Sequence, residues 1–458
     1  MKFIQLFLVL CAFNSLIASN LPYELTNKVY DTEIKTVTLE SDYSSSTIPI
    51  ISINGGNLRL NFDDLLNEER RFYYKIIHCD KNWNVSGMRD IDFINGFNDE
   101  LMRNYEYSTN TRIKFIHYWL DLPNENTTFK ISGNYVLLIY EENADTPILT
   151  RRFIVNENLT GVQISQIYPA DVQNIRYKQE FTVNINLNKL KPRNPVDEVS
   201  IVMLKNANWD ESVNAKPSFF SGNNLRFSKL QTLEFWGLSE YREFDTRSIF
   251  RVGRGVEKVH RRADGTDIIL QKDTTRTNQV HLFIFDNNGQ FYIDNADITK
   301  NYSSLNILDQ ISNNNDPLQL ASLRSSIQNS ESEDERHSRS DYTEVNFLLD
   351  APILLQENQN IYILGAMNNW QPEEEYLMKY DTRRDMYMAQ VLLKQGYYNY
   401  YYGIVADGEK IDYQALEGSW NETENEYLTL AYYKGVGDLY DRVIGFDVFN
   451  TNKTSIKY

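Results

Sequence analysis

Short runs rich in apolar residues, each bounded by turn residues, recur along the chain. Examples are YYKIIHC at 73–79, NYVLLIY at 134–140, VSIVMLK at 199–205 and YLTLAYY at 427–433. Runs of this length, separated by Gly, Asn, Asp and Pro, are typical of antiparallel β-strands. The sequence shows neither a long helical pattern nor a βαβ alternation. We therefore expect an all-β fold: tandem antiparallel β-sandwich domains of the immunoglobulin-like kind, joined by a polar linker.

The composition changes between residues 303 and 343, where the apolar runs stop. This segment contains ISNNNDP and SSIQNSESEDERHSRSD and has no aromatic residue between Tyr302 and Tyr342. It buries too little apolar surface to offset the entropy lost on ordering, so we expect a partly disordered linker, with LQLASLRSSI as one short helix. The pattern thus divides the chain into a signal peptide (1–19), an N-terminal β domain (20–158), a second β-sandwich domain (159–302), the linker (303–343) and a C-terminal Ig-like or early-set sandwich (344–458).

Two dipeptides in the second domain predict tight hairpins. Asn288-Gly289 lies between HLFIFD and QFYI, and Asp264-Gly265 lies before TDIIL. Asn-Gly and Asp-Gly tolerate the positive φ angles of a two-residue turn. We expect a strand on each side of both turns.

The first nineteen residues, MKFIQLFLVLCAFNSLIAS, predict a secretory signal peptide cleaved between Ala18 and Asn20. The alternative is a membrane anchor, but the apolar run is shorter than the ~20 residues that a span needs. Leu10 before Cys11 is not the small residue that a lipoprotein signal requires. The mature chain then keeps only Cys79 and no internal disulfide. We expect an exported protein whose mature chain is water-soluble and not inserted directly in a membrane.

The chain is acidic, with a formal net charge of −17 at pH 7. Such a surface repels nucleic acid, which we exclude as a partner. One short stretch has the opposite sign, and its basic residues are Arg251, Arg254, Lys258, His260, Arg261 and Arg262. Clustered cations steer association with an acidic partner surface, so these residues are candidate partner contacts. The alternative is a solvated hairpin without a partner.

No motif in the sequence predicts catalysis, a metal or a cofactor. His78 and Cys79 are adjacent, but neighbours in a strand point to opposite faces, so His78 does not activate the thiol without a bulge. The alternative bases are His117 and His281, but a free Cys on an aromatic strand is usually a buried small side chain. The five histidines lack metal-binding spacing, and no CxxC occurs. We predict a protein that is not an enzyme.

Short elements follow one another in a fixed order in the N-terminal domain. They are Cys79, Asp80 and Trp83; Gly96 and Phe97; Tyr105 and Ser108; Leu122, Pro123 and Asn124; Ser132, Gly133, Asn134 and Tyr135; and Thr150, Arg151, Arg152 and Phe153. The C-terminal half adds Leu393 to Tyr400; Glu417, Gly418 and Ser419; Thr423, Glu424, Asn425 and Tyr427; and Tyr432 and Tyr433. This order resembles the plug protein family of the type 9 secretion system, an outer-membrane export machine of Gram-negative bacteria.

The resemblance implies a non-enzymatic periplasmic protein associated with the outer membrane. Such a protein binds the periplasmic mouth of the outer-membrane translocon barrel and plugs it when no substrate is in transit.

A second resemblance covers about 50 residues of the C-terminal domain. ILGAMNNW at 363–370 and LKQGYYNY at 393–400 are similar to glycogen- and starch-binding sandwich modules. The resemblance implies sugar contacts at Trp370 and, where the modules carry a lysine, at Tyr401. The Asp407-Gly408 turn lacks the tryptophan that follows it in those modules. The alternative function is therefore a periplasmic or surface glucan-binding accessory protein.

Overall fold

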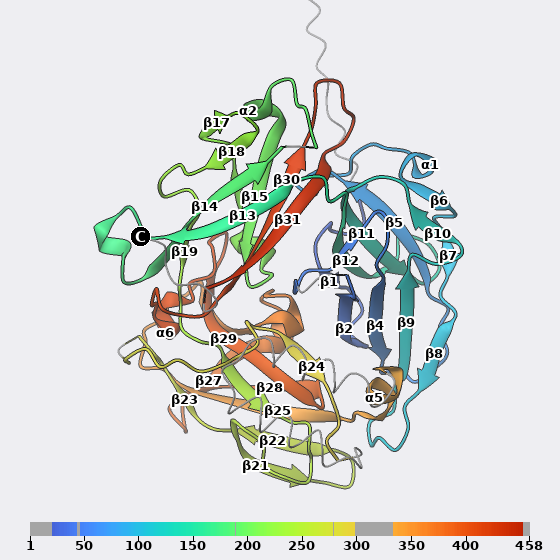
Figure 1. Cartoon of the computed structure of the whole chain (residues 1–458). Coiled ribbons are helices and arrows are strands. Elements are labelled where there is room, and N and C mark those ends of the chain that lie inside the picture. The colour runs from blue at the N-terminus through green and yellow to red at the C-terminus, as the bar shows by residue number, and fades with distance from the viewer. Residues whose placement is uncertain (1–20, 44–45, 188, 278, 298–332, 452–458) are drawn as a thin grey trace, which may run out of the picture.

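The computed structural model describes residues 21–43, 46–187, 189–277, 279–297 and 333–451 (Figure 1). The predicted signal peptide, residues 303–332 of the predicted linker and the helix expected within them lie outside these ranges. The described part is mostly β and forms several largely antiparallel sheets, which confirms the expected class. Its helices are short: α1 (Asp90–Phe93), α2 (Pro195–Glu198), α5 (Glu333–Arg339), α6 (Gln414–Glu417) and the 3₁₀ turns η1 (Val172–Asn174), η2 (Trp209–Glu211), η3 (Ala366–Asn368) and η4 (Glu374–Tyr376). Among these helices, none has the length and apolar character needed to span a membrane.

The N-terminal residues form two packed sheets. The inner N-terminal sheet contains β1 (Lys28–Val29), β3 (Ile50–Ser52), β5 (Tyr73–Cys79), β7 (Glu100–Leu101), β11 (Gly133–Tyr140) and β12 (Pro147–Asn156). The outer N-terminal sheet contains β2 (Ile34–Ser41), β4 (Leu58–Asp64), β8 (Asn104–Tyr107) and β9 (Ile116–Leu122). A small ribbon pairs β6 (Ile94–Gly96) with β10 (Thr127–Phe129). Phe62 and Tyr118 of the outer sheet pack against Tyr135 and Phe153 of the inner sheet in one core.

The middle of the chain contributes two further sheets. The flanking sheet contains β13 (Gly161–Ile167), β14 (Lys178–Asn186), β17 (Phe219–Ser221), β18 (Asn224–Phe227) and β19 (Glu234–Trp236). The central sheet contains β15 (Val199–Lys205), β16 (Val213–Ala215), β30 (Glu426–Tyr433) and β31 (Arg442–Asn450). In Figure 1 the red β30 and β31 lie beside the green β13 and β15.

A ten-stranded sheet curls around a single core and nearly closes into a barrel. Its strands are β20 (Arg242–Asp245), β21 (Val256–Arg261), β22 (Thr266–Leu270), β23 (Asp273–Thr274), β24 (Phe291–Ile293), β25 (Tyr342–Asp350), β26 (Gln359–Leu364), β27 (Leu377–Asp381), β28 (Met386–Lys394) and β29 (Gly396–Ala406).

The sheets do not form a row of separate tandem sandwiches, and in this respect the expected arrangement is wrong. β30 pairs with β15 over 199–205 and 427–433, so the predicted second and C-terminal segments share the central sheet. β20 and β24 both pair with β29, so the same two segments also share the ten-stranded sheet. The pattern of a strand identifies it as a strand but not its partner, which is why the sequence did not show this exchange.

The continuous apolar runs of the sequence are explained by burial on both faces. In β15, Ile201 and Met203 face the flanking sheet, whereas Val202 and Leu204 face the inner N-terminal sheet. Because side chains alternate across a strand, a run without polar positions is needed when both faces are covered. Four layers result, in the order outer N-terminal, inner N-terminal, central and flanking sheet.

The two predicted hairpins have different outcomes. β21 and β22 form the hairpin expected around Asp264-Gly265. Asn288 and Gly289 have the expected positive φ angles of 53° and 80°, but residues 279–287 before them form no strand. Here the Asp286 carboxylate accepts hydrogen bonds from the backbone amides of Tyr241 and Asn288. These side-chain hydrogen bonds replace the backbone pairing that a β-strand would make.

The end of the predicted linker is packed into the structure. Residues 333–343 supply α5 and the start of β25, and Ser340 and Asp341 are buried. The Asp341 carboxylate accepts the backbone amides of Arg112 (2.9 Å) and Ile113 (3.1 Å). This stretch therefore joins the N-terminal sandwich to the ten-stranded sheet.

A buried carboxylate forms the centre of that junction. Asp63 of β4 accepts hydrogen bonds from Lys394 Nζ (2.5 Å), Tyr342 Oη (2.6 Å) and His117 Nδ1 (2.8 Å). Asp63, Lys394 and His117 are 0% exposed. Burial alone raises the pKa of Asp63, but Lys394 and His117 beside it outweigh burial and hold that pKa below its usual value. Asp63 is therefore charged and is paired across the junction.

Replacing Asp63 by leucine should lower the free energy of unfolding by about 3–5 kcal/mol, because the Lys394 ammonium would remain buried without its counterion. Urea unfolding of the mature protein at pH 7 measures this loss. The double variant Asp63→Leu/Lys394→Met should recover a large part of it. A single variant that loses less than about 1 kcal/mol, the range of a surface pair, would show that the junction does not depend on this charge.

Candidate functional site

The β21–β22 hairpin positions the basic cluster of the sequence. It forms one edge of the ten-stranded sheet and lies at the bottom of Figure 1, at the far end from β17 and β18. Arg251 and Arg254 lie in the loop before β21, Lys258, His260 and Arg261 lie on β21, and Arg262 begins the turn. The structure thus brings the predicted contact residues together on one hairpin and its approach.

The five Arg and Lys side chains differ in how far they are neutralised. Arg254 pairs with Glu243 (2.7 Å), and Arg262 pairs with Asp264 (3.2 Å) and Asp267 (2.9 Å). Arg251, Lys258 and Arg261 are exposed and form no ion pair within the described residues. Three positive charges are therefore free to meet a partner.

Apolar side chains lie next to these free charges. Phe250 and Val252 are each 60% exposed in the loop before β21. The Arg261 guanidinium lies 4.4 Å from the centre of the Phe250 ring, a cation–π contact that holds it over the loop. We call Phe250, Arg251, Val252, Lys258 and Arg261 the basic edge surface. A surface that combines free cations with exposed apolar groups is suited to protein contact.

The two candidate sugar contacts lie in the interior. Trp370 is 5% exposed and Tyr401 is 1% exposed. Tyr401 stacks on Tyr241 with ring centres 3.7 Å apart, and its hydroxyl donates to the Ser239 carbonyl. A buried ring offers no face to a sugar, so this arrangement gives no support to glucan binding at these residues.

The adjacent His78 and Cys79 point to opposite sides of β5, as the alternation predicts. The His78 ring contacts Ser86 Oγ (2.8 Å) and the Ser132 carbonyl (3.3 Å). Cys79 is 0% exposed and packs between the inner N-terminal and central sheets. Burial raises the pKa of its thiol to about 12, so the reactive thiolate is not formed at neutral pH.

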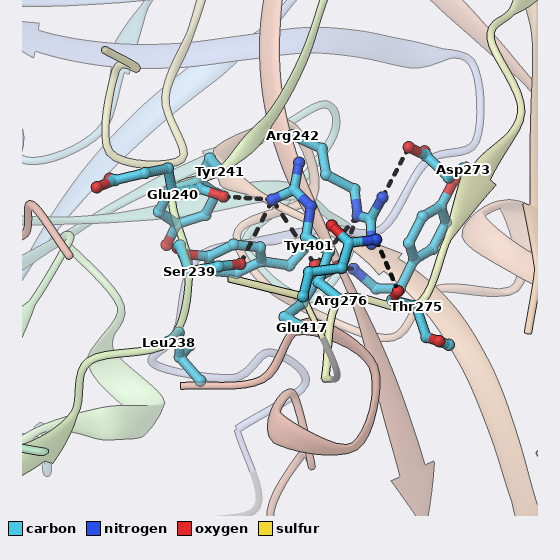
Figure 2. A network of polar contacts seen from close by, with 12 residues as sticks. Leu238, Ser239, Glu240, Tyr241, Arg242, Asp273, Thr275, Arg276, Tyr401 and Glu417 are labelled. Atoms are coloured by element: carbon cyan, nitrogen blue, oxygen red, sulfur yellow. Dashed lines mark hydrogen bonds and ion pairs between the residues drawn. The ribbon is translucent and has the colours of Figure 1, made fainter. Parts of the chain in front are cut away.

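A polar network that the sequence did not reveal connects β20 with α6, β23 and β29 (Figure 2). Arg242 of β20 donates to Glu417 Oε1 (2.9 Å), Asp273 Oδ1 (2.7 Å) and the Thr274 carbonyl (2.8 Å). Glu417 also accepts the Tyr402 amide (2.9 Å). Burial alone lowers the pKa of Arg242, but the adjacent carboxylates outweigh it and keep the guanidinium charged. These contacts hold β20 and β23, from the predicted second domain, to β29 and α6, from the predicted C-terminal domain.

Three carboxyl groups lie buried beside this network: Glu240, Asp286 and Glu424. Burial, followed by the neighbouring Asp286, raises the pKa of Glu240 to about 9. Burial, followed by Glu424, raises the pKa of Asp286 to about 8. Within the described ranges, no group of His, Cys, Asp and Glu has the geometry to hold a metal ion. The raised pKa values favour the protonated form of Glu240 and Asp286 near neutral pH.

Residues 34–157, which span β2 to β12, match the family model described as the type 9 secretion system plug protein first domain. The chain is thus a layered β protein whose N-terminal sandwich is similar to a domain of a known class of secretion components. In particular, residues 34–157 are similar to the first domain of the type 9 secretion system plug protein, which confirms the resemblance over this region.

Most of the chain is also similar to a solved structure, a hypothetical protein from Parabacteroides merdae. The two share 26% sequence identity and a TM-score of 0.80, and the match covers 94% of this chain and all of that one. The shared architecture therefore extends beyond the N-terminal sandwich to the exchanged strands. No curated protein matches the chain.

The raised carboxyl pKa values predict how stability depends on pH. A folded-state pKa above the unfolded value means that the folded protein keeps a proton which the unfolded chain releases, so stability falls as pH rises from roughly 5 to 9. Glu240→Gln should reduce this slope by about 1 kcal/mol per pH unit.

Urea unfolding at several pH values measures the slope, and the exposed Glu357 supplies a matched control as Glu357→Gln. An unchanged slope in Glu240→Gln would mean that Glu240 carries no proton in the folded state.

Proposed function

We propose that this protein is a non-enzymatic component of the type 9 secretion system. It resides in the periplasm at the outer membrane, binds the periplasmic mouth of the translocon barrel and plugs it when no substrate is in transit. The observation that carries the proposal is the match of residues 34–157 to the first domain of the plug family.

The architecture supports this role because a plug must keep its shape without chemistry. The central sheet is covered on both faces, and Asp63 and Arg242 hold buried ion pairs between segments distant in sequence. Removing one partner from such a pair leaves an uncompensated charge, so partial opening is costly. A protein of this kind keeps its shape when it is seated in the mouth of a wide pore.

The basic edge surface supplies a contact for an acidic rim of the translocon. The chain as a whole is acidic, with a net charge of −17, so an acidic partner is repelled elsewhere and attracted here. The glucan-binding alternative has no corresponding support, because Trp370 and Tyr401 are buried.

Deleting the protein should make the outer membrane permeable to large hydrophilic compounds, because an unplugged barrel remains open. Growth in vancomycin and entry of a fluorescent dextran measure this leak. Deleting the translocon as well should restore the barrier. A single-deletion strain that excludes vancomycin as well as its parent does would refute the proposed function.

Reversing the three free charges, as Arg251→Glu/Lys258→Glu/Arg261→Glu, should weaken co-purification with the translocon and reproduce part of the leak. Arg254 is left unchanged, because its reversal would repel its partner Glu243 and confuse folding with binding. Raising the salt concentration should weaken the wild-type contact in the same direction.

The matched control is Lys191→Glu/Arg226→Glu/Lys229→Glu, an equal change of charge at exposed residues of the flanking sheet and its loops. It should seal and co-purify like the wild type. Equal behaviour of the two triple variants would remove the basic edge surface from the translocon contact.

A further inference from the structure

β21 is an edge strand with one open side. It ends the order of the ten-stranded sheet, and in the described part of the chain it pairs only with β22. In an antiparallel pair, alternate residues direct their backbone groups toward the partner strand and the others direct them outward. The outer side of Val256–Arg261 therefore presents a row of backbone donors and acceptors.

The side chains of this edge are mainly basic. Charged side chains on an edge strand prevent pairing with unintended strands, and a partner of opposite charge can recognise them. Glu257, Lys258, His260 and Arg261 are exposed. From 250 to 267 the chain carries five Arg and Lys side chains against three carboxylates, in a protein whose net charge is −17. Repulsion between copies of this edge disfavours self-pairing, whereas an acidic strand meets no such barrier.

Exposed apolar side chains lie next to this edge. Phe250 and Val252 are each 60% exposed, and Arg261 stacks on the Phe250 ring. Added strands gain affinity from main-chain hydrogen bonds and specificity from side-chain contacts at alternate positions. Backbone edge, free cations and exposed apolar groups thus lie together.

We propose that the outer edge of β21 binds an extended acidic segment of a partner protein as an added strand. Carboxylates of the segment meet Lys258 and Arg261, and one of its apolar side chains rests on Phe250. Six residues of β21 span about 20 Å, which matches a strand of ordinary length. The inference deepens the proposed function. The binding of an acidic strand is argued from β21 itself, and only the identification of the partner as the translocon rests on the proposed function.

The test uses the full mature protein and a fluorescent eight-residue peptide, Glu-Glu-Thr-Thr-Glu-Glu-Thr-Thr. Its paired carboxylates reach both faces of the added strand, because Lys258 and Arg261 are three residues apart and point to opposite faces of β21. Fluorescence anisotropy should show binding at low salt. The same peptide N-methylated at every residue keeps its charge but has no backbone N–H, and its affinity should fall by about tenfold or more. Hydrogen exchange of the β21 amides should slow with the first peptide and not with the second.

Two protein variants complete the test. Arg251→Glu/Lys258→Glu/Arg261→Glu should lose binding, and Lys191→Glu/Arg226→Glu/Lys229→Glu should keep it, with circular dichroism confirming that both fold. Equal binding of the two peptides would show charge attraction only and overturn strand addition, and so would no binding of the unmodified peptide. Peptide binding together with an intact barrier in the deletion strain would refute the plug and leave the strand site standing.

Discussion

The pairing of β15 with β30 is the constraint on which the rest of the structure depends. Seven register pairs, from Val199 with Tyr433 to Lys205 with Tyr427, join residues more than two hundred positions apart. The central sheet that they form is covered by the flanking sheet on one face and by the inner N-terminal sheet on the other. Without β30, β15 would keep only the short β16 as a neighbour, and both cores would lose part of the sheet that separates them. The same pairing also anchors the ten-stranded sheet. In the sequence β29 of that sheet is followed by α6 and then by β30 of the central sheet, so the two sheets are directly connected.

The buried charges follow from that arrangement. The chain passes from the flanking sheet to the ten-stranded sheet and later returns to the central sheet. The surfaces that are buried in this way carry polar residues as well as apolar ones, and each buried polar group needs a partner. Asp63 meets Lys394 at one junction and Arg242 meets Glu417 at the other. Buried ion pairs add little net stability over apolar packing, but a wrong register leaves them unpaired at a large cost. We infer that they select this assembly over other strand exchanges.

Local features of the fold were predictable from the sequence, and long-range ones were not. The strand runs, the β21–β22 hairpin and the opposite orientation of His78 and Cys79 all follow from alternation and turn chemistry. The exchange of β30 and the role of Asp63 did not, because pairing partners are set by packing between segments that no local window contains. Lys394 and Glu417 belong to elements that the resemblance had singled out without a role, and their buried ion pairs now give a physical reason for those residue types. The sugar contacts at Trp370 and Tyr401 came from the same kind of local motif, and there the motif reflects core packing.

The layered arrangement also explains why the basic cluster is placed on a hairpin at the edge. The inner N-terminal and central sheets use both of their faces for packing, so binding surfaces remain only at loops and sheet edges. β21 is one such edge, and three of its surrounding cations lack an internal counterion among the described residues. In an acidic protein the free cations make the electrostatic field asymmetric, and under the proposed function this field would orient an acidic partner toward this edge. The rigidity of the body and the charge of this edge are therefore linked under the proposed function: the rigid packing leaves few surfaces open, and the positive charge would favour this edge for an acidic partner.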